Sequence, residues 1–121
     1  MSTALVVEDS LTDLEIITQC LLRGGLNVLT AKNGEEALAK ISICKPDVIV
    51  LDVVLPDRSG FELCRDLKAE AGTSKIPVVI CSTKGSEIDK FWGLKQGADA
   101  YLAKPVDQKQ LLLTIKQLIR G

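Results

Sequence analysis

Residues 48–52 read Val48-Ile49-Val50-Leu51-Asp52, four consecutive apolar residues followed at once by an acid. An unbroken apolar run that does not alternate with polar residues is typical of a parallel strand buried on both faces. Comparable apolar runs occupy residues 4–7, 26–29, 76–81 and 100–103. The sequence therefore predicts five strands of one parallel sheet.

Each apolar run is followed by a segment in which apolar residues recur at helical spacing. The starts of these helices are indicated by N-cap residues with a polar partner three positions later. The five pairs are Ser10 with Asp13, Asn33 with Glu36, Ser59 with Glu62, Ser86 with Asp89, and Asp107 with Gln110. Gly24-Gly25 and Gly97 are expected to end the first and fourth helices.

Strands that alternate with helices predict an α/β fold of the (βα)5 type, and 121 residues give room for one domain, residues 1–121. Right-handed crossovers place helices on both faces of an open, doubly wound five-stranded parallel sheet. In the flavodoxin-like strand order 2-1-3-4-5, ligands bind beyond the carboxyl ends of the strands, between strands one and three.

The composition excludes several classes of function. Fifteen basic and sixteen acidic residues give a net charge of −1, which argues against nucleic acid or an anionic membrane surface as the main partner. The chain has no histidine, so a Ser-His-Asp triad, a Cys-His pair and histidine-containing metal sites are excluded.

The location expected from the sequence is the cytoplasm. No apolar run approaches the roughly 20 residues of a membrane helix, and the first residues lack the basic stretch of a signal peptide. The cysteines form no C-x-x-C pair, and we expect them to be reduced thiols in the core or on helices. They are Cys20, Cys44, Cys64 and Cys81.

Polar residues whose side chains could bind a metal ion or take part in a reaction follow four of the five apolar runs. They are Glu8-Asp9, Asp52, Ser82-Thr83 and Lys104-Pro105. In the order 2-1-3-4-5, the acids follow the two strands that flank the crevice. Three carboxylates at one edge repel one another unless a cation neutralises them, and oxygen-only ligation favours a hard ion such as Mg²⁺. The alternative is that Glu8 and Asp9 only stabilise the first helix through its dipole.

In combination, these motifs resemble the receiver domain of two-component response regulators over the whole chain. The residues that carry the resemblance are Glu8-Asp9, Asp52, Pro56-Asp57-Arg58-Ser59-Gly60, Ser82 and Tyr101-Leu102-Ala103-Lys104-Pro105.

The resemblance implies that Asp52 accepts a phosphoryl group from a histidine kinase and that Ser82 and Lys104 contact phosphoryl oxygens. It further implies that Mg²⁺ is held by the carboxylates of Glu8, Asp9 and Asp52 and by the main-chain carbonyl of Val54. Ser82 and Tyr101 would form a switch, and the family's lysine precedes a cis-proline, as in Lys104-Pro105. Asp57 is the acid nearest to Asp52 that could compete with it as the phosphorylation site.

We therefore interpret the chain as a bacterial single-domain response regulator that catalyses only its own phosphorylation and dephosphorylation. Its output would be the binding of a downstream protein at the fourth helix, fifth strand and fifth helix, roughly residues 86–119. Phe91-Trp92 and the following Gly-Leu-Lys-Gln-Gly-Ala run resemble stand-alone receivers of pilus motility and phototaxis.

Three other functions are compatible with an α/β fold of this size. A pseudo-receiver would be a constitutive protein-binding module that is never phosphorylated, although no acid or lysine of the pattern is missing here. A phosphatase with an aspartate nucleophile would want a second acid at position 54, which holds Val54. A flavin-binding protein of the same fold would suffer repulsion between Glu8-Asp9 and the flavin phosphate.

Overall fold

The computed structural model describes residues 2–120 and alternates strands with helices along that whole range. The strands are β1 (Thr3–Val7), β2 (Asn27–Ala31), β3 (Val48–Leu51), β4 (Val78–Ser82) and β5 (Ala100–Ala103). The helices are α1 (Leu11–Arg23), α2 (Gly34–Ile43), α3 (Gly60–Ala69), α4 (Glu87–Lys95) and α5 (Gln108–Arg120). The sheet is parallel and has the order β2-β1-β3-β4-β5, so the predicted flavodoxin-like fold is confirmed.

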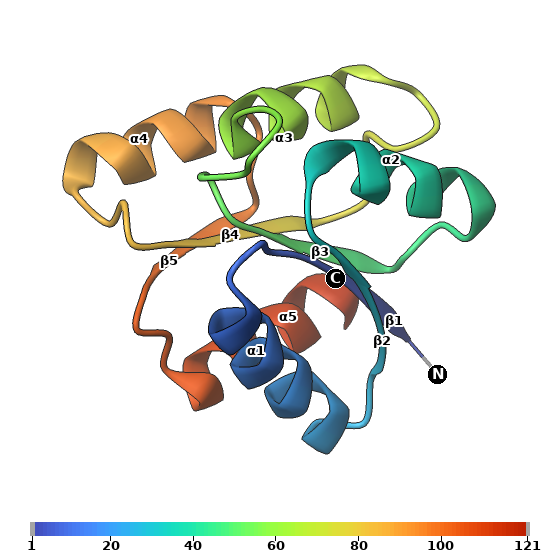
Figure 1. The fold of residues 1–121 in the computed structure, drawn as a ribbon, viewed down its shortest axis with the longest axis vertical. Helices are drawn as coiled ribbons and strands as arrows, with labels where there is room; N and C mark the ends of the chain where they lie inside the picture. The colour runs from blue at the N-terminus through green and yellow to red at the C-terminus, as the bar shows by residue number, and fades with distance from the viewer. Residues whose placement is uncertain (1, 121) are drawn as a thin grey trace.

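The sheet lies between two layers of helices, with α2, α3 and α4 on one face and α1 and α5 on the other (Figure 1). Alternate residues of β1 enter different cores: Leu5 and Val7 pack with the first layer, and Ala4 and Val6 with the second. All four are at most 1% exposed. Because each central strand is buried on both faces, it has no polar face to produce an alternating pattern.

Two strands begin later than the apolar runs suggest. The β2 run starts at Leu26, but the Leu26 N–H donates to the Leu21 carbonyl and closes the turn after α1. The strand therefore begins at Asn27 and stays paired with β1 as far as Ala31. At β4, Pro77 has no N–H to donate to the sheet, and the strand begins at Val78.

The predicted helix starts are confirmed, since all five N-cap side chains accept a hydrogen bond from a backbone N–H of their helix. The partner differs at α3, where Ser59 accepts from Phe61 rather than from Glu62. Glu62 pairs instead with Arg58, at 3.0 Å. After α1 and α4, the left-handed positions fall on Gly25 (φ 88°) and Gly97 (φ 101°).

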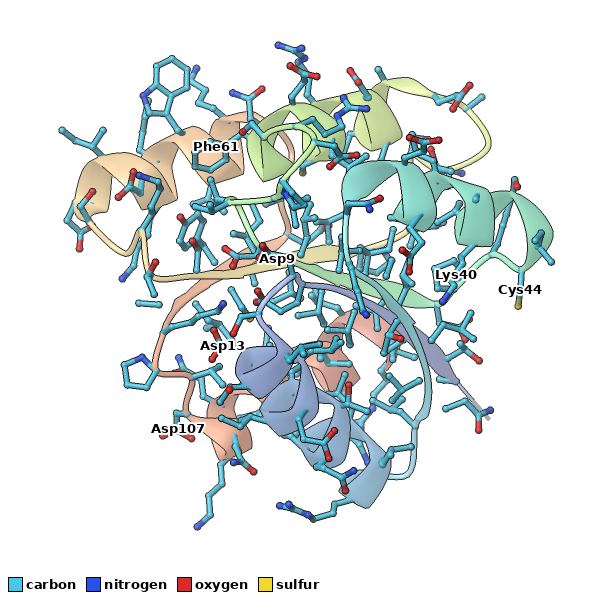
Figure 2. The ribbon with its side chains drawn as sticks, in the orientation of Figure 1. Asp9, Asp13, Lys40, Cys44, Phe61 and Asp107 are labelled. Atoms are coloured by element: carbon cyan, nitrogen blue, oxygen red, sulfur yellow. The ribbon has the colours of Figure 1, made fainter. Side chains whose placement is uncertain are left out.

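All four cysteines are free thiols. Cys20, Cys64 and Cys81 are buried, whereas Cys44 is exposed at the end of α2 and its sulfur points away from the protein (Figure 2). Within residues 2–120, no helix has the length and apolar character needed to cross a bilayer.

Candidate functional site

Four charged side chains meet at the carboxyl ends of β1 and β3. The Lys104 Nζ atom donates hydrogen bonds to Glu8 Oε1 (2.5 Å), Asp52 Oδ2 (2.9 Å) and Asp13 Oδ2 (3.0 Å). The Lys104, Glu8 and Asp52 side chains are only 8%, 2% and 9% exposed. An ammonium group has three N–H donors, so each of the three carboxylates receives one.

Burial and the lysine act in opposite directions on the two buried acids. Burial alone would raise the pKa of Asp52, but the Lys104 ammonium and the Ser82 hydroxyl hold that pKa below its ordinary value. Burial dominates at Glu8 and raises its pKa, which the Lys104 bond only partly offsets. Burial alone would lower the pKa of Lys104, but its bonds to Glu8 and Asp52 have the larger effect. The pKa of Lys104 is therefore raised, and the side chain remains a cation.

Asp9 lies outside this cluster. It is exposed, and it follows β1 where the chain turns towards α1, whereas Asp13 lies in the first turn of α1 (Figure 2). Across residues 2–120, no three acidic side chains converge closely enough to form a ready metal site. The donors near Asp52 are nevertheless oxygens, the ligand type that Mg²⁺ prefers. The magnesium ligands Glu8, Asp9, Asp52 and Val54 therefore stay a prediction.

Ser82 and Tyr101 contact the backbone of the same residue, Lys84, from its two sides. Ser82, at the end of β4, is fully buried, and its Oγ accepts a hydrogen bond from the Lys84 N–H at 3.2 Å. The Tyr101 hydroxyl donates to the Lys84 carbonyl. The Tyr101 ring also packs on α4, where a Cβ at Gly93 would lie 2.5 Å from its Cδ2 atom. A path of direct contacts thus runs from Ser82 through Lys84 and Tyr101 to α4.

The loop after Asp52 is attached to α2. Asp57 Oδ1 accepts from the Gly34 N–H and Asp57 Oδ2 from the Glu35 N–H, both at 2.9 Å. The bond from Gly34 is the main reason why the pKa of Asp57 lies below its ordinary value. Asp57 is the acid nearest in sequence that could compete with Asp52 for a phosphoryl group, but its carboxylate caps the N-terminus of α2 together with Asn33.

Gly60 allows the same loop to return against the backbone of Asp52. A Cβ on Gly60 would lie 2.0 Å from the Asp52 carbonyl oxygen and 2.8 Å from the Val53 Cα. Both neighbours are backbone atoms beside the candidate nucleophile and cannot turn aside as a side chain would. The first residue of α3 must therefore be glycine.

We expect Gly60→Ala to lower the free energy of unfolding by about 2 kcal/mol, because the added methyl group forces the Asp52 backbone to move. Glycine-to-alanine changes in helices ordinarily stabilise, so the sign itself is informative. Chemical denaturation measures the change. Gly72→Ala is the control, since its Cβ would meet only the flexible Lys45 Nζ atom, at 3.2 Å, and a Gly60→Ala protein as stable as this control would contradict the prediction.

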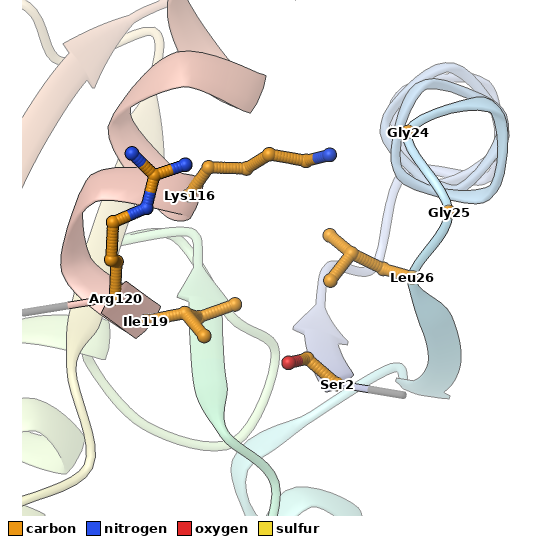
Figure 3. A pocket seen from close by; sticks show the side chains of 7 residues that line it. All are labelled: Ser2, Gly24, Gly25, Leu26, Lys116, Ile119 and Arg120. Atoms are coloured by element: carbon orange, nitrogen blue, oxygen red, sulfur yellow. The ribbon is translucent and has the colours of Figure 1, made fainter.

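A hollow of about 250 Å³ lies at the opposite end of the sheet. Ser2, which precedes β1, and Leu26, which precedes β2, face Lys116, Ile119 and Arg120 of α5 across it (Figure 3). Because it opens at the amino ends of the strands, this hollow is not part of the acidic cluster.

The structure brings together Glu8, Asp52 and Lys104, as the sequence predicts, and adds Asp13. In the sequence, Asp13 is only the partner of the Ser10 N-cap, and its contact with Lys104 joins residues 91 positions apart. The one available signal is its place in the first turn of the helix that directly follows Glu8-Asp9.

Comparisons with known proteins agree with this arrangement. The family model of the response regulator receiver domain matches residues 4–116. Protein PilH of Pseudomonas aeruginosa is 45% identical over 121 residues, which cover the whole of both chains. The receiver domain of Francisella response regulator 1452 has a TM-score of 0.92 at 31% identity, over 99% of this chain and 98% of that chain. The chemotaxis protein CheY4 of Vibrio cholerae has a TM-score of 0.89 at 32% identity, over 98% of both chains. The chain belongs to the response regulator receiver domain family.

Proposed function

We propose that this protein is a single-domain response regulator that accepts a phosphoryl group on Asp52 from a histidine kinase and signals by binding a downstream protein. Receiver domains are signalling modules of two-component systems. The observation that carries the proposal is the buried Asp52 carboxylate at the end of β3, bonded to the Lys104 ammonium at 2.9 Å.

The proposed transfer is a displacement at phosphorus. An Asp52 carboxylate oxygen forms a bond to the phosphorus of a phosphohistidine while the phosphorus–nitrogen bond breaks. The electron pair of that bond goes to the imidazole nitrogen, which takes up a proton. Such reactions depend on positioning and charge stabilisation, and Lys104 supplies a fixed cation at the oxygen of Asp52. Attack by water later breaks the new oxygen–phosphorus bond and restores the carboxylate.

We propose that the carboxylates of Glu8, Asp9 and Asp52 and the main-chain carbonyl of Val54 hold Mg²⁺. A bound magnesium ion supplies positive charge against the phosphoryl oxygens. The need for it is supported by the charge count, because one ammonium faces three carboxylates in the cluster. Glu8 and Asp52 are buried, so bulk solvent screens their charges only weakly.

The output surface is proposed to be α4, β5 and α5, with α4 as the main contact. Four large apolar side chains of this nine-residue helix are more than half exposed, namely Ile88, Phe91, Trp92 and Leu94. Exposed apolar clusters of this kind mark sites of protein interaction. The similarity to PilH and to the chemotaxis protein CheY4 supports a role in motility or taxis.

Intact mass spectrometry after incubation with acetyl phosphate tests this function. We expect one phosphoryl group per chain when Mg²⁺ is present, and none with excess chelator or in Asp52→Asn. Asp57→Asn is the control and should still be phosphorylated, since Asp57 caps α2. An adduct that persists in Asp52→Asn would contradict the assignment, and the absence of any adduct would favour the constitutive binding module.

A further inference from the structure

Asp13 differs from the other two partners of Lys104 in its exposure. Its carboxylate binds Nζ at 3.0 Å, nearly as closely as Asp52 at 2.9 Å. The Asp13 side chain, however, is 36% exposed, whereas Glu8 and Asp52 are 2% and 9% exposed. Asp13 is thus the only one of the three acids that water can readily solvate.

The hydrogen-bonding capacity of Lys104 makes this difference consequential. All three N–H donors of the ammonium are engaged, so an arriving phosphoryl oxygen must displace one carboxylate. Releasing Glu8, or Asp52 before it has reacted, would leave a buried charge without its partner, which is costly. Releasing Asp13 costs little, because water replaces the lost bond and exposed ion pairs are weak.

We propose that Asp13 is a positioning residue that acts through Lys104: it holds the ammonium in the unphosphorylated protein and must release it before Lys104 can bind the phosphoryl group, so that it slows phosphorylation of Asp52. This inference rests on the proposed function. It extends that function by naming a residue that regulates the same site.

The part that Asp13 plays in capping α1 can be separated from its contact with Lys104. The cap of α1 uses the backbone N–H of Asp13, which donates to Ser10 Oγ at 3.3 Å. The Asp13 side chain instead turns to Lys104. Asp13→Asn therefore keeps the cap bond and removes the charge that binds the ammonium.

The control variant is Glu36→Gln. Glu36 occupies the same position of α2, with its backbone N–H donating to the Asn33 cap. It forms no ion pair within residues 2–120. The two variants thus share the loss of a first-turn charge and its effect on the helix dipole, but only Asp13→Asn affects Lys104.

The experiment measures the rate of phosphorylation by acetyl phosphate with Mg²⁺ present. Asp13→Asn is expected to react about three- to tenfold faster at low ionic strength, with a smaller gain in high salt because Asp13 is exposed and screened. Glu36→Gln should react at the wild-type rate. Asp13→Asn should change the rate at most about twofold when Lys104→Gln is also present, since Asp13 acts through Lys104.

A second measurement covers the case in which Lys104→Gln does not fold. The ammonium protons of Lys104, followed by nitrogen-15 NMR, should exchange faster with water in Asp13→Asn but not in Glu36→Gln. The role of Asp13 would be overturned if Asp13→Asn were phosphorylated at the wild-type rate. It would also be overturned if the Lys104 ammonium protons exchanged equally fast in Asp13→Asn and Glu36→Gln. If wild type itself accepts no phosphoryl group, it is the proposed function that fails, so the two failures are distinguishable.

Discussion

Replacing Lys104 with methionine is expected to lower the free energy of unfolding by about 3 kcal/mol at neutral pH without divalent cations. Methionine retains the apolar stem, so packing changes little. The loss comes from the buried carboxylates of Glu8 and Asp52, which keep their burial but lose the ammonium that bonds both of them. Removing one partner of a buried ion pair destabilises a protein more than replacing both partners with apolar residues, because it leaves a buried charge unpaired.

The effect of this substitution should depend on pH. In wild type the lowered pKa of Asp52 gives stability that is present above its ordinary pKa and lost as pH falls, whereas the raised pKa of Glu8 acts in the opposite sense. Without Lys104, burial and mutual repulsion raise both pKa values. The variant then loses stability as pH rises through these two pKa values. The difference in the free energy of unfolding between variant and wild type is therefore largest near pH 7 and narrows towards about pH 4.

Denaturant unfolding of both proteins across this pH range, with chelator present, measures the difference. Lys32→Met is the control, because Lys32 follows β2 as Lys104 follows β5 but is exposed and forms no ion pair within residues 2–120. A Lys104→Met protein whose deficit stays constant from neutral to acid pH would show that the lost stability does not come from the carboxylates.

Ser82→Ala and Tyr101→Phe are expected to have non-additive effects on the response of α4 to phosphorylation. Both side chains bond the backbone of Lys84: Ser82 accepts from the N–H of the peptide before its Cα, and Tyr101 donates to the carbonyl of the peptide after it. If Ser82 turns to a phosphoryl oxygen, it leaves the Lys84 N–H; the Lys84 backbone then shifts, its carbonyl with it, and this changes the position of the Tyr101 ring on α4. Coupling between two such sites is typically about 1–3 kcal/mol, or roughly 5- to 150-fold.

Hydrogen exchange of residues 83–97, with and without beryllium fluoride as a phosphoryl mimic, measures this coupling. Each single variant should reduce the change in protection seen in wild type, and the double variant should reduce it no more than the stronger single one. Tyr101→Phe keeps the ring on Gly93, so the effect reports the hydroxyl. Reductions that simply add would mean that Ser82 and Tyr101 act independently.

The parts of the structure that could be predicted from sequence are local or directly follow a strand. Apolar runs identify the strands because each core strand is buried on both faces, and N-caps are bonds between residues two or three positions apart. Glu8, Asp52 and Lys104 meet because the carboxyl ends of parallel strands share one edge. The sheet order places Glu8 and Asp52 after adjacent strands, and the long Lys104 side chain reaches both from β5, two strands beyond β3.

Asp13 and Asp57 could not be assigned in this way. Their partners lie 91 and 22 or 23 positions away, and the contacts depend on how α1 and α2 are rotated against the sheet. Asp9 is exposed, although it adjoins Glu8 in a pattern that suggested equivalent roles. Strand spacing identifies the edge at which a side chain lies, but the direction in which it turns depends on tertiary packing.

The bond between Glu8 and Lys104 joins residues 96 positions apart, nearly the length of the chain. β5, which precedes Lys104, pairs only with β4, and β4 in turn pairs with β3. A partly folded chain in which β5 has not yet docked therefore has Asp52, the proposed phosphoryl acceptor, without the Lys104 ammonium that bonds it. If Asp52 accepts a phosphoryl group as proposed, its site is complete only after the last strand has docked, and we expect an incompletely folded copy to react more slowly than the native protein.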